Sequence, residues 1–352
     1  MNKQDTLVIL SPGFPADEAD SACLPAQQVF VNSLKKNFPQ LRIIIFAFQY
    51  PYVKSKYWWY GNEVISFNGK NKIRLRRLSL WLSVWKTLRR LQKENNIIGL
   101  LSFWCGECAF IGKYFGKVYH IKFIGWITGQ DAKKGNRYIT VIRPEPAEIV
   151  ALSDFLANEF YKNYKVRTSA VIPNGIDPNL FGKPQKEKDI DILGAGSLIP
   201  LKQYNIFIEV IAAIRKSFPS LCAMLCGDGP EKTKLADLIE KNDLGNNFLF
   251  AGEIPHKEVL QTMQRSKIFL HTSSYEGFST VCLEALYAGA HVISFCKPMH
   301  REIAHWHIVS GKEEMIDKAF QLLYDPSTEY ESILAYSMDE SARTMMKLFG
   351  VI

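Results

Sequence analysis

Two carboxylates, Glu276 and Glu284, stand eight residues apart in the second half of the chain. An apolar run at 267–271 predicts a strand before them, and apolar residues at helical spacing over 281–288 predict a helix after a tight turn. Backbone N–H groups at the start of such a helix attract an anion such as a diphosphate. Carboxylates accept hydrogen bonds from hydroxyl groups and repel phosphate, so two of them beside an anion site suit a polyol phosphate. A sugar nucleotide contains both kinds of group.

The turn between the two carboxylates contains the groups that would meet the anion. Ser279 or Thr280 is predicted as the N-cap of the helix, and Gly289 stands where the helix should end. The amides of Phe278, Ser279 and Thr280 would then point out of the helix N-terminus. The competing interpretation is an ordinary amphipathic helix, in which the first acid complements the helix dipole and the second is solvated. The spacing of the two acids alone leaves both interpretations open.

Three glycine-containing loops follow predicted strands in the same half of the chain, at Gly196, Gly227 and Gly252. Glycine lets a backbone approach a phosphate closely. Lys202 follows the first loop and supplies a movable cation. Because the carboxyl ends of parallel strands share one edge of a sheet, these loops and the turn at Glu276 are expected to lie together.

An alternation of strands and helices along the whole chain predicts an α/β fold. The length of 352 residues exceeds the usual size of a single core and favours two domains. Strands at 6–10 and 41–48 enclose a predicted helix at 25–36, and the same rhythm restarts after a polar, proline-containing linker at 183–188. Two Rossmann-like doubly wound domains that face each other across a cleft are therefore expected.

The composition restricts the location and the partners. No apolar run reaches a membrane-spanning length and no secretory signal is recognised at the N-terminus, so the predicted location is cytoplasmic. The seven cysteines are scattered through predicted strands and helices, which is typical of reduced thiols. The net charge of +8 favours anionic partners, whether phosphates, lipid headgroups or nucleic acid.

A basic amphipathic helix is predicted over residues 70–94. Its apolar stripe is predicted to consist of Leu75, Leu78, Leu82, Trp85, Leu88 and Leu91. Such a helix either packs its stripe in the domain core or makes a peripheral contact with an anionic membrane on its cytoplasmic face. Its aromatic residues fit the stripe better than exposed stacking platforms, so nucleic acid is not an expected partner.

The turn at residues 104–108 has the Trp-Cys-Gly-x-Cys pattern of a thioredoxin redox motif. A hundred residues with strands of their own precede this turn, and no proline in the expected cis-loop context follows it, so a structural turn is favoured. The other close pair, Cys222 and Cys226, brackets a predicted strand, which argues against a zinc site.

Taken together, these motifs resemble the retaining GT-B glycosyltransferases, in particular glycosyltransferase family 4. In chain order the resemblance rests on Gly194, Gly196, Ser197, Lys202, Gly227, Asp228, Gly229, Pro230, Phe250, Gly252, Glu276, Gly277, Phe278, Glu284, Ala285, Leu286, Ala288 and Gly289. It covers about residues 5–325. It implies an acceptor domain at 1–175, a nucleotide-sugar donor domain at 176–325, and a helical segment at 326–352 that crosses back to the first domain.

The resemblance also implies roles for single residues. Lys202 matches the basic residue on the diphosphate, Glu284 the acid that binds the ribose, and Glu276 the acid that touches the transferred sugar. Ile254 matches a nucleobase contact made largely through the backbone. The other donor-binding positions implied are Gly13, Gly196, Ser197, Gly227, Gly277, Phe278, Ser279 and Thr280.

Several positions depart from the family pattern. Ser197 leaves Lys202 as the one obvious cation for the diphosphate, and Gly13 alone represents the usual glycine-rich first loop. Thr128 stands where the family often has a histidine, so Asp131 is the polar candidate for a catalytic role near the reacting sugar. These changes affect the acceptor and the sugar more than the nucleotide.

The implied activity is transfer of a sugar from a UDP- or GDP-sugar to a glycan or lipid-linked acceptor with retention of the anomeric configuration, as in polysaccharide biosynthesis. The leaving diphosphate helps to take the acceptor proton, so the protein supplies positioning and charge stabilisation. Neither a metal nor another cofactor is required. Two alternatives stay open: an isomerase or hydrolase of nucleotide sugars on the same fold, and a non-catalytic nucleotide-sugar-binding subunit.

Overall fold

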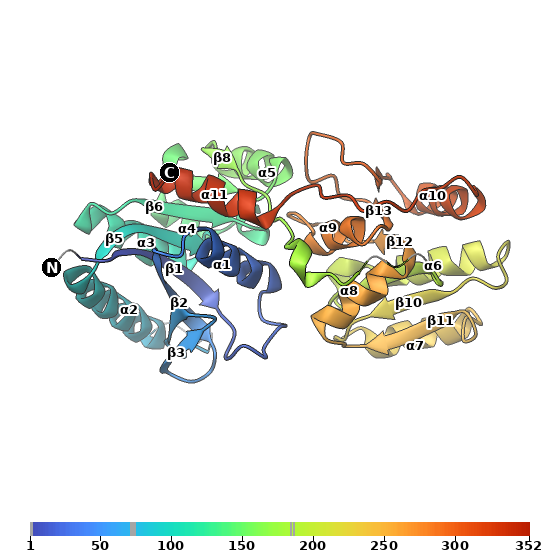
Figure 1. The fold of residues 1–352 in the computed structure, drawn as a ribbon, viewed down its shortest axis with the longest axis horizontal. Coiled ribbons are helices and arrows are strands. Elements are labelled where there is room, and N and C mark those ends of the chain that lie inside the picture. The colour runs from blue at the N-terminus through green and yellow to red at the C-terminus, as the bar shows by residue number, and fades with distance from the viewer. Residues whose placement is uncertain (1–2, 71–74, 184, 186) are drawn as a thin grey trace. The chain divides into compact units, whose positions relative to one another are not determined.

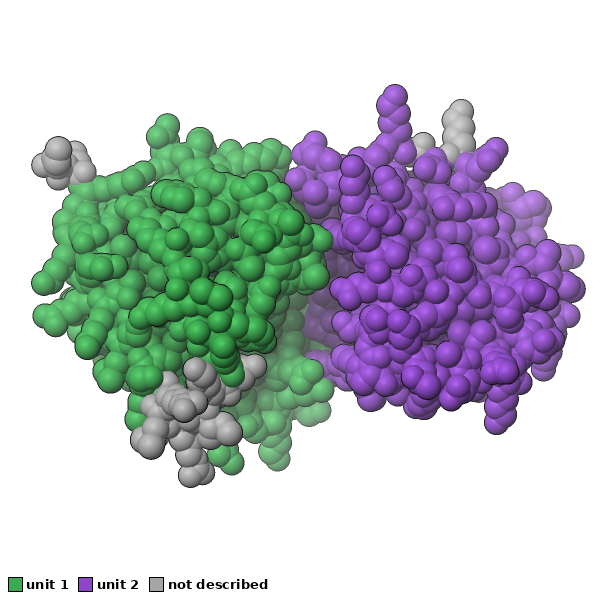
Figure 2. Space-filling view, turned by 90° about the horizontal axis from the view of Figure 1, so that it is seen from below, with its two compact units in different colours: residues 1–175, 338–352 green, residues 176–337 purple. Residues whose placement is uncertain are grey.

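The structure is a computed structural model that describes residues 3–70, 75–183, 185 and 187–352. The chain divides into two compact units. Unit 1 consists of Met1–Gly175 and Met338–Ile352, and unit 2 of Ile176–Ser337, as the two colours of Figure 2 show. Each unit has a sheet of its own.

Unit 1 is built on an eight-stranded sheet with the strand order β3-β4-β2-β1-β5-β6-β7-β8. Its strands are β1 (Asp5–Gly13), β2 (Arg42–Tyr50), β3 (Ser55–Trp59), β4 (Asn62–Ser66), β5 (Asn96–Phe103), β6 (Phe123–Ile127), β7 (Ile149–Ala151) and β8 (Ala170–Val171). All neighbours are parallel except β3 and β4, which form an antiparallel hairpin. Consecutive buried residues in β1 show that both faces of the sheet are covered.

The β3–β4 hairpin was not predicted. Its turn consists of Tyr60 and Gly61, which both have positive φ (41° and 70°), as a two-residue hairpin of strands with right-handed twist requires. Two-residue hairpin turns are usually indicated by Asn-Gly, Asp-Gly or Gly-Gly. Because Tyr60 replaces the usual first residue, the sequence does not indicate a hairpin here.

The helices of unit 1 are α1 (Pro25–Asn37), α2 (Leu75–Glu94), α3 (Glu107–Tyr119), α4 (Arg137–Ile142), α5 (Asp154–Tyr164) and α11 (Met338–Phe349), with short 3-10 turns η1 (Gln130–Ala132) and η2 (Pro146–Glu148). Helix α11 lies beside α1 (Figure 1), where the Asp339 carboxylate accepts hydrogen bonds from Lys36 at 2.7 Å and Asn37 at 2.8 Å. Within the predicted C-terminal segment, residues 326–337 belong to unit 2 and only Met338–Phe349 is helical.

Helix α2 buries a different stripe from the one predicted. Leu88 and Leu91 are buried as expected, and they are joined by Leu80 and Val84. The prediction was wrong for Leu78 and Leu82, which are 52% and 61% exposed. Both stripes have helical spacing, and packing against the sheet decided between them. Residues 71–74 of the predicted helix lie outside the described residues, as does the Leu75 side chain.

Unit 2 contains a six-stranded sheet with the order β11-β10-β9-β12-β13-β14. Its strands are β9 (Ile190–Ala195), β10 (Ala223–Cys226), β11 (Phe248–Gly252), β12 (Ser266–His271), β13 (His291–Ser294) and β14 (Trp306–Ile308). All neighbouring pairs are parallel. Numbered along unit 2, this order is 3-2-1-4-5-6, the doubly wound Rossmann arrangement, so the predicted fold class is confirmed.

The helices of unit 2 are α6 (Tyr204–Arg215), α7 (Lys232–Lys241), α8 (His256–Gln264), α9 (Thr280–Tyr287) and α10 (Lys312–Tyr324), with 3-10 turns η3 (Pro178–Leu180) and η4 (Pro200–Lys202). The apolar faces of α6, α7 and α10 share one core with the sheet, in which Ile192, Phe207, Leu225, Ile268 and Ile293 are fully buried. Of the described helices in the chain, none combines the length and the apolar character needed to cross a membrane.

Three histidines stack at the β13–β14 edge of unit 2. The His291 and His305 rings are 4.3 Å apart, and Nδ1 of His291 lies 3.0 Å from Nε2 of His307. Burial, and then the charges of His291, Lys318 and His305, lower the pKa of His307 from 6.5 to about 4. Burial also lowers the pKa of His291.

Unit 2 is therefore expected to lose stability as the pH falls from 6.5 to 4. In that range His307 is protonated in the unfolded chain but not in the folded chain. The free energy of unfolding therefore becomes smaller as the pH falls. Urea unfolding of the wild type and His307→Gln at several pH values tests this. The wild type should lose its advantage over the variant below pH 6.5, and a difference independent of pH would contradict the expectation.

Candidate functional site

A cavity of about 550 Å³ lies at the carboxyl ends of the strands in unit 2. Strands β9 and β12 are neighbours there, although β10 and β11 lie between them in the sequence, which makes this the switch point where ligands of doubly wound sheets bind. The lining residues are Ala195, Gly196, Ser197, Lys202, Cys226, Gly227, Asp228, Glu253, Ile254, His256, Val259, Glu276, Phe278, Ser279, Thr280, Val281 and Glu284.

Most of the predicted donor-binding residues thus line one cavity. Gly13 and Asp131 belong to unit 1. Gly277 lies in the turn between Glu276 and Phe278 and is not among the described residues that line the cavity.

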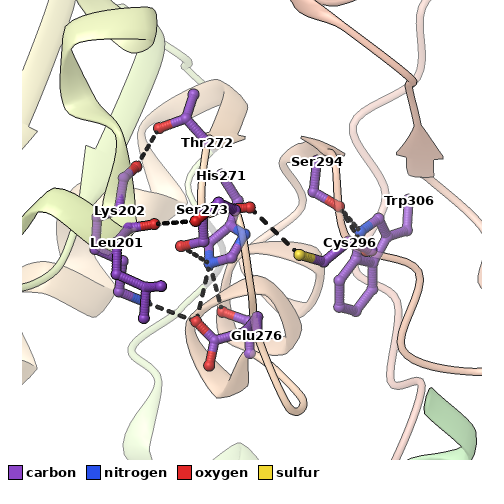
Figure 3. Close-up of polar contacts among 11 residues, drawn as sticks. Leu201, Lys202, His271, Thr272, Ser273, Glu276, Ser294, Cys296 and Trp306 are labelled. Atoms are coloured by element: carbon purple, nitrogen blue, oxygen red, sulfur yellow. Dashed lines mark hydrogen bonds and ion pairs between the residues drawn. The ribbon is translucent and has the colours of Figure 1, made fainter. Parts of the chain in front are cut away.

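Lys202 and Glu276 form an ion pair in this cavity, with Nζ 2.7 Å from Oε2 and side chains 20% and 25% exposed. Lys202 ends η4 after β9, and Glu276 lies in the loop after β12. Two hydrogen bonds to backbone carbonyls hold the two loops together: Thr272 Oγ1 donates to the Lys202 carbonyl at 2.7 Å, and the Ser274 N–H donates to the Leu201 carbonyl at 3.0 Å. Figure 3 shows the contacts of Lys202 with Glu276 and Thr272. The fold therefore joins a cation and an acid that are 74 residues apart.

The Glu276 carboxyl is ionised under all ordinary conditions. Burial raises its pKa, but the polar contact with His271 Nε2 and the charge of Lys202 together lower it to about 2. Burial lowers the pKa of His271, which therefore remains neutral. The site thus combines a fixed anion and a cation, which suits a ligand with hydroxyl groups next to phosphates.

The glycine turns pack directly on each other. Gly227 has φ +148°, and a Cβ added to it would lie 2.0 Å from the Gly196 carbonyl oxygen. The Gly227 N–H donates to the Gly252 carbonyl at 2.7 Å, and the Gly196 N–H donates to the Cys226 carbonyl at 3.0 Å. Residues of all three loops line the cavity, and glycine is required at Gly227 because its backbone meets that of Gly196.

Ser279 occupies the N-cap position of α9, as predicted, but its side chain makes no capping hydrogen bond. Its hydroxyl lies 3.1 Å from Nε2 of His271. Phe278 before it is buried and stacks on Trp306 with ring centroids 6.0 Å apart. The turn is therefore held by a buried ring and a buried histidine, while Ser279 and Thr280 line the cavity.

Glu284 is buried, with Oε1 2.8 Å from Nε2 of His256. The alternative of a solvated second acid on an ordinary amphipathic helix is therefore wrong. The hydrogen bond to Glu284 raises the pKa of His256, although burial opposes it. His256 begins α8 directly after the loop that contains Ile254, and both line the cavity.

Two histidines of the site, His256 and His271, received no role from sequence reasoning. His271 lies in the strand predicted at 267–271 and His256 in the loop predicted after Gly252, and a histidine in either place has no local pattern that distinguishes a site residue from a core residue. The available signal was position: His271 ends a strand and His256 follows a strand-end loop.

Asp131 in unit 1 holds its own turn. Its Oδ1 accepts hydrogen bonds from the Thr128 and Gly129 N–H groups at 3.2 and 2.8 Å, and its Oδ2 accepts one from the Cys105 N–H at 2.9 Å. Burial raises the pKa of Asp131, and the backbone hydrogen bonds oppose that rise. Both carboxylate oxygens are thus occupied by backbone donors.

All seven cysteines are free thiols. Cys105 and Cys108 are buried, and burial raises their pKa values well above the ordinary value, the opposite of what a redox motif needs. In the part of the chain that the structure describes, no three His, Cys, Asp or Glu side chains cluster so as to hold a metal ion.

Known proteins resemble the chain in sequence and in structure. Residues 176–333 match the family model of Glycosyl transferases group 1. One subunit of the phosphatidylinositol N-acetylglucosaminyltransferase of Arabidopsis thaliana is 28% identical over 127 residues, which are 35% of this chain and 28% of that protein. The phosphatidylinositol N-acetylglucosaminyltransferase gpi3 subunit of Schizosaccharomyces pombe is 34% identical over 128 residues, which are 36% of this chain and 28% of that protein.

The matched segment thus spans 28% of the length of each of these two curated relatives. Among solved structures, Anabaena Alr3699/HepE in complex with UDP and glucose aligns over 100% of both chains, with a TM-score of 0.74 and 15% sequence identity. Residues 176–333 are therefore a glycosyl transferases group 1 domain, in a chain whose two α/β units have the GT-B fold.

Proposed function

We propose that this protein is a glycosyltransferase that moves a sugar from a UDP- or GDP-sugar to a glycan or lipid-linked acceptor and retains the anomeric configuration. The observation that carries the proposal is the convergence of Lys202, Glu276 and Glu284 with the glycine turns around one cavity at the sheet's switch point. A cation, two acids and a helix N-terminus match the phosphates and hydroxyl groups of a nucleotide sugar.

In this proposal each part of the donor has its own contact. The diphosphate lies between Lys202 and the start of α9, where the ammonium and the helix dipole favour negative charge. Glu284, held by His256, accepts hydrogen bonds from the ribose hydroxyls, and Glu276 accepts them from the sugar. The base lies beside the Ile254 loop.

The reaction breaks the bond between the anomeric carbon and the diphosphate oxygen and forms a bond from the same face to the acceptor oxygen. The acceptor proton passes to the departing phosphate oxygen, so no protein base is needed. Lys202 stabilises the charge that develops on the diphosphate, and Glu276 orients the sugar. No metal is needed in this scheme. Asp131 contributes by holding the turn at Thr128 rather than by proton transfer.

The comparisons indicate which donors to test first. The relatives are named N-acetylglucosaminyltransferases, and the structural neighbour holds UDP and glucose. UDP-N-acetylglucosamine and UDP-glucose are accordingly the first donors in the proposal, and phosphatidylinositol is the first lipid acceptor.

A peripheral membrane contact is part of the proposal for a lipid-linked acceptor. Leu78 and Leu82 of α2 are exposed, and Lys86, Arg89 and Lys93 continue the same face at helical spacing. Exposed leucines next to cations suit the interface of an anionic bilayer. Co-sedimentation with vesicles of anionic and neutral lipids tests this, and equal binding of Leu78→Ser/Leu82→Ser and wild-type protein would contradict it.

Calorimetry against UDP, GDP, ADP and the corresponding nucleotide sugars tests the donor site, and product analysis with and without acceptor tests the reaction. Binding of UDP or GDP followed by acceptor-dependent transfer is the expected result. Binding of no nucleotide would refute the proposal. Donor turnover without acceptor would favour the hydrolase or isomerase, and tight binding without turnover on any acceptor would favour the non-catalytic subunit.

A further inference from the structure

His271 lies beneath the proposed donor site, at the end of β12. Its side chain is 4% exposed, and it is not among the described residues that line the cavity. It stands at the strand end where the chain leaves the sheet toward Glu276 and α9. The buried ring contacts Glu276 and Ser279, two residues that line the cavity, while it does not itself line the cavity.

One ring nitrogen of His271 makes all of its polar contacts. Nε2 lies 3.1 Å from Ser279 Oγ, 3.2 Å from Ser273 Oγ and 3.6 Å from Glu276 Oε2. Figure 3 shows Glu276 between this ring and Lys202. The other nitrogen, Nδ1, is buried and has no hydrogen-bond partner among the described residues.

This asymmetry selects one tautomer. The ring is neutral and carries a single proton. A proton on Nδ1 would be a buried donor without a partner, which is costly. On Nε2 it faces an ionised carboxylate and two hydroxyl oxygens. Nε2–H is therefore the favoured form, and it directs one hydrogen-bond donor at Glu276 and the serines.

The contact with Ser279 has a second consequence. A serine at the N-cap position normally accepts a hydrogen bond from the first turn of its helix. Ser279 makes no such bond, because its hydroxyl faces His271. No amide of the first turn of α9 is thus taken up by this side chain, at the place where the proposed diphosphate would need amide donors.

We propose that His271 is a positioning residue that holds Glu276 and Ser279, through Nε2 alone, in the arrangement that the nucleotide sugar requires. The inference rests on the proposed function of the cavity. Through Nε2, His271 links Glu276, the acid beside the sugar, to Ser279 at the start of the helix that meets the phosphates. Loss of this contact lets Ser279 cap α9 and frees Glu276 to follow Lys202.

Two amide substitutions separate the role of Nε2 from that of the ring. In His271→Gln the side-chain amide nitrogen reaches the position of Nε2, whereas in His271→Asn it reaches only the position of Nδ1. We expect the Gln variant to stay within about threefold of wild type. The Asn variant should bind UDP roughly 10-fold to 100-fold more weakly, as for other losses of a residue that orients a site residue, with a similar fall in kcat.

Calorimetry with UDP, initial rates and thermal unfolding of both variants decide the question. If both variants lost UDP affinity and kcat equally, in step with a lower melting temperature, the role of His271 would be merely structural and the inference would be overturned. Wild-type UDP affinity and kcat in both variants would overturn it as well. If wild-type protein binds UDP but transfers no sugar, the proposed function fails, and the order of the UDP affinities alone decides on His271. Should the Asn variant not fold, the Gln variant alone decides: UDP affinity and kcat within about threefold of wild type support the role of Nε2, and a larger loss at an unchanged melting temperature overturns it.

Discussion

Replacement of Lys202 by alanine is expected to lower kcat by roughly 10²-fold or more, as for other losses of a preorganised charge stabiliser. The ammonium lies in the cavity at the switch point, 2.7 Å from Glu276. Its removal leaves the developing charge of the diphosphate without this cation. It also leaves the ionised Glu276 without its partner, so the donor KM should rise as well. Initial rates at saturating and limiting donor measure both effects.

Lys267→Ala is the matched control for this substitution. Lys267 forms an ion pair with Asp191 at 2.8 Å, and the two side chains are 33% and 19% exposed, close to the values for Lys202 and Glu276. Lys267 lies in β12 and Asp191 in β9, the two strands whose following loops contain Glu276 and Lys202. The control pair therefore joins the strands themselves and not the loops beyond their carboxyl ends. We expect its loss to change turnover less than about twofold, because a partly exposed pair contributes little. Wild-type turnover in Lys202→Ala, or equal losses in both variants, would refute the role of Lys202.

Gly227→Ala is expected to weaken binding of UDP more than about 10-fold and to destabilise unit 2. Gly227 has φ +148°, which alanine rarely adopts, and the added methyl group would lie 2.0 Å from a backbone carbonyl that cannot rotate away. The backbone strain alone costs about 1–3 kcal/mol. The loops after β9 and β10 must separate, which displaces Gly196 and the N–H contact to Gly252. Urea unfolding and calorimetry with UDP measure the two effects.

Gly245→Ala is the control for the general cost of a methyl group in unit 2. No heavy atom lies within 4 Å of the Cβ that it would add, and its backbone is outside the left-handed region. It should change the free energy of unfolding by less than about 0.5 kcal/mol and leave UDP binding unchanged. If Gly227→Ala behaved like Gly245→Ala, the close contact of the glycine loops would not be a requirement of the site.

Much of the fold of unit 2 follows from local patterns. The strand predicted at 267–271 and the helix predicted at 281–288 agree with β12 and α9 to within one residue at each end, because both periodicities are properties of neighbouring residues. The hairpin of β3 and β4 and the edge strand β14 were missed. These strands are short, and their pairing partners rather than their own residues make them strands.

The exposed face of α2 shows the limit of such patterns. The sequence contains two leucine-rich stripes with helical spacing, one through Leu78 and Leu82 and one through Leu80 and Val84. Which stripe is buried depends on the rotation of the helix against the sheet, a matter of packing between elements. The same holds for Asp131, which the resemblance offered as the polar candidate near the reacting sugar: the three backbone N–H groups that its carboxylate meets are set by the packing of the chain and not by its own neighbours in sequence.

The sequence by itself determined the α/β rhythm, the glycine turns, Lys202 and the Glu276–Glu284 pair, because residue type and short spacing are enough to recognise a turn, a helix start and a polar group at a strand end. Only the tertiary structure decided that Glu276 pairs with Lys202 while Glu284 pairs with His256, and that His271 holds Ser279 away from its helix. These partners come from different strand ends, and only the strand order 3-2-1-4 brings β9 and β12 together. Hydrogen bonds act over about 3 Å, so they form only once the packing of the sheet has set which strand ends are neighbours.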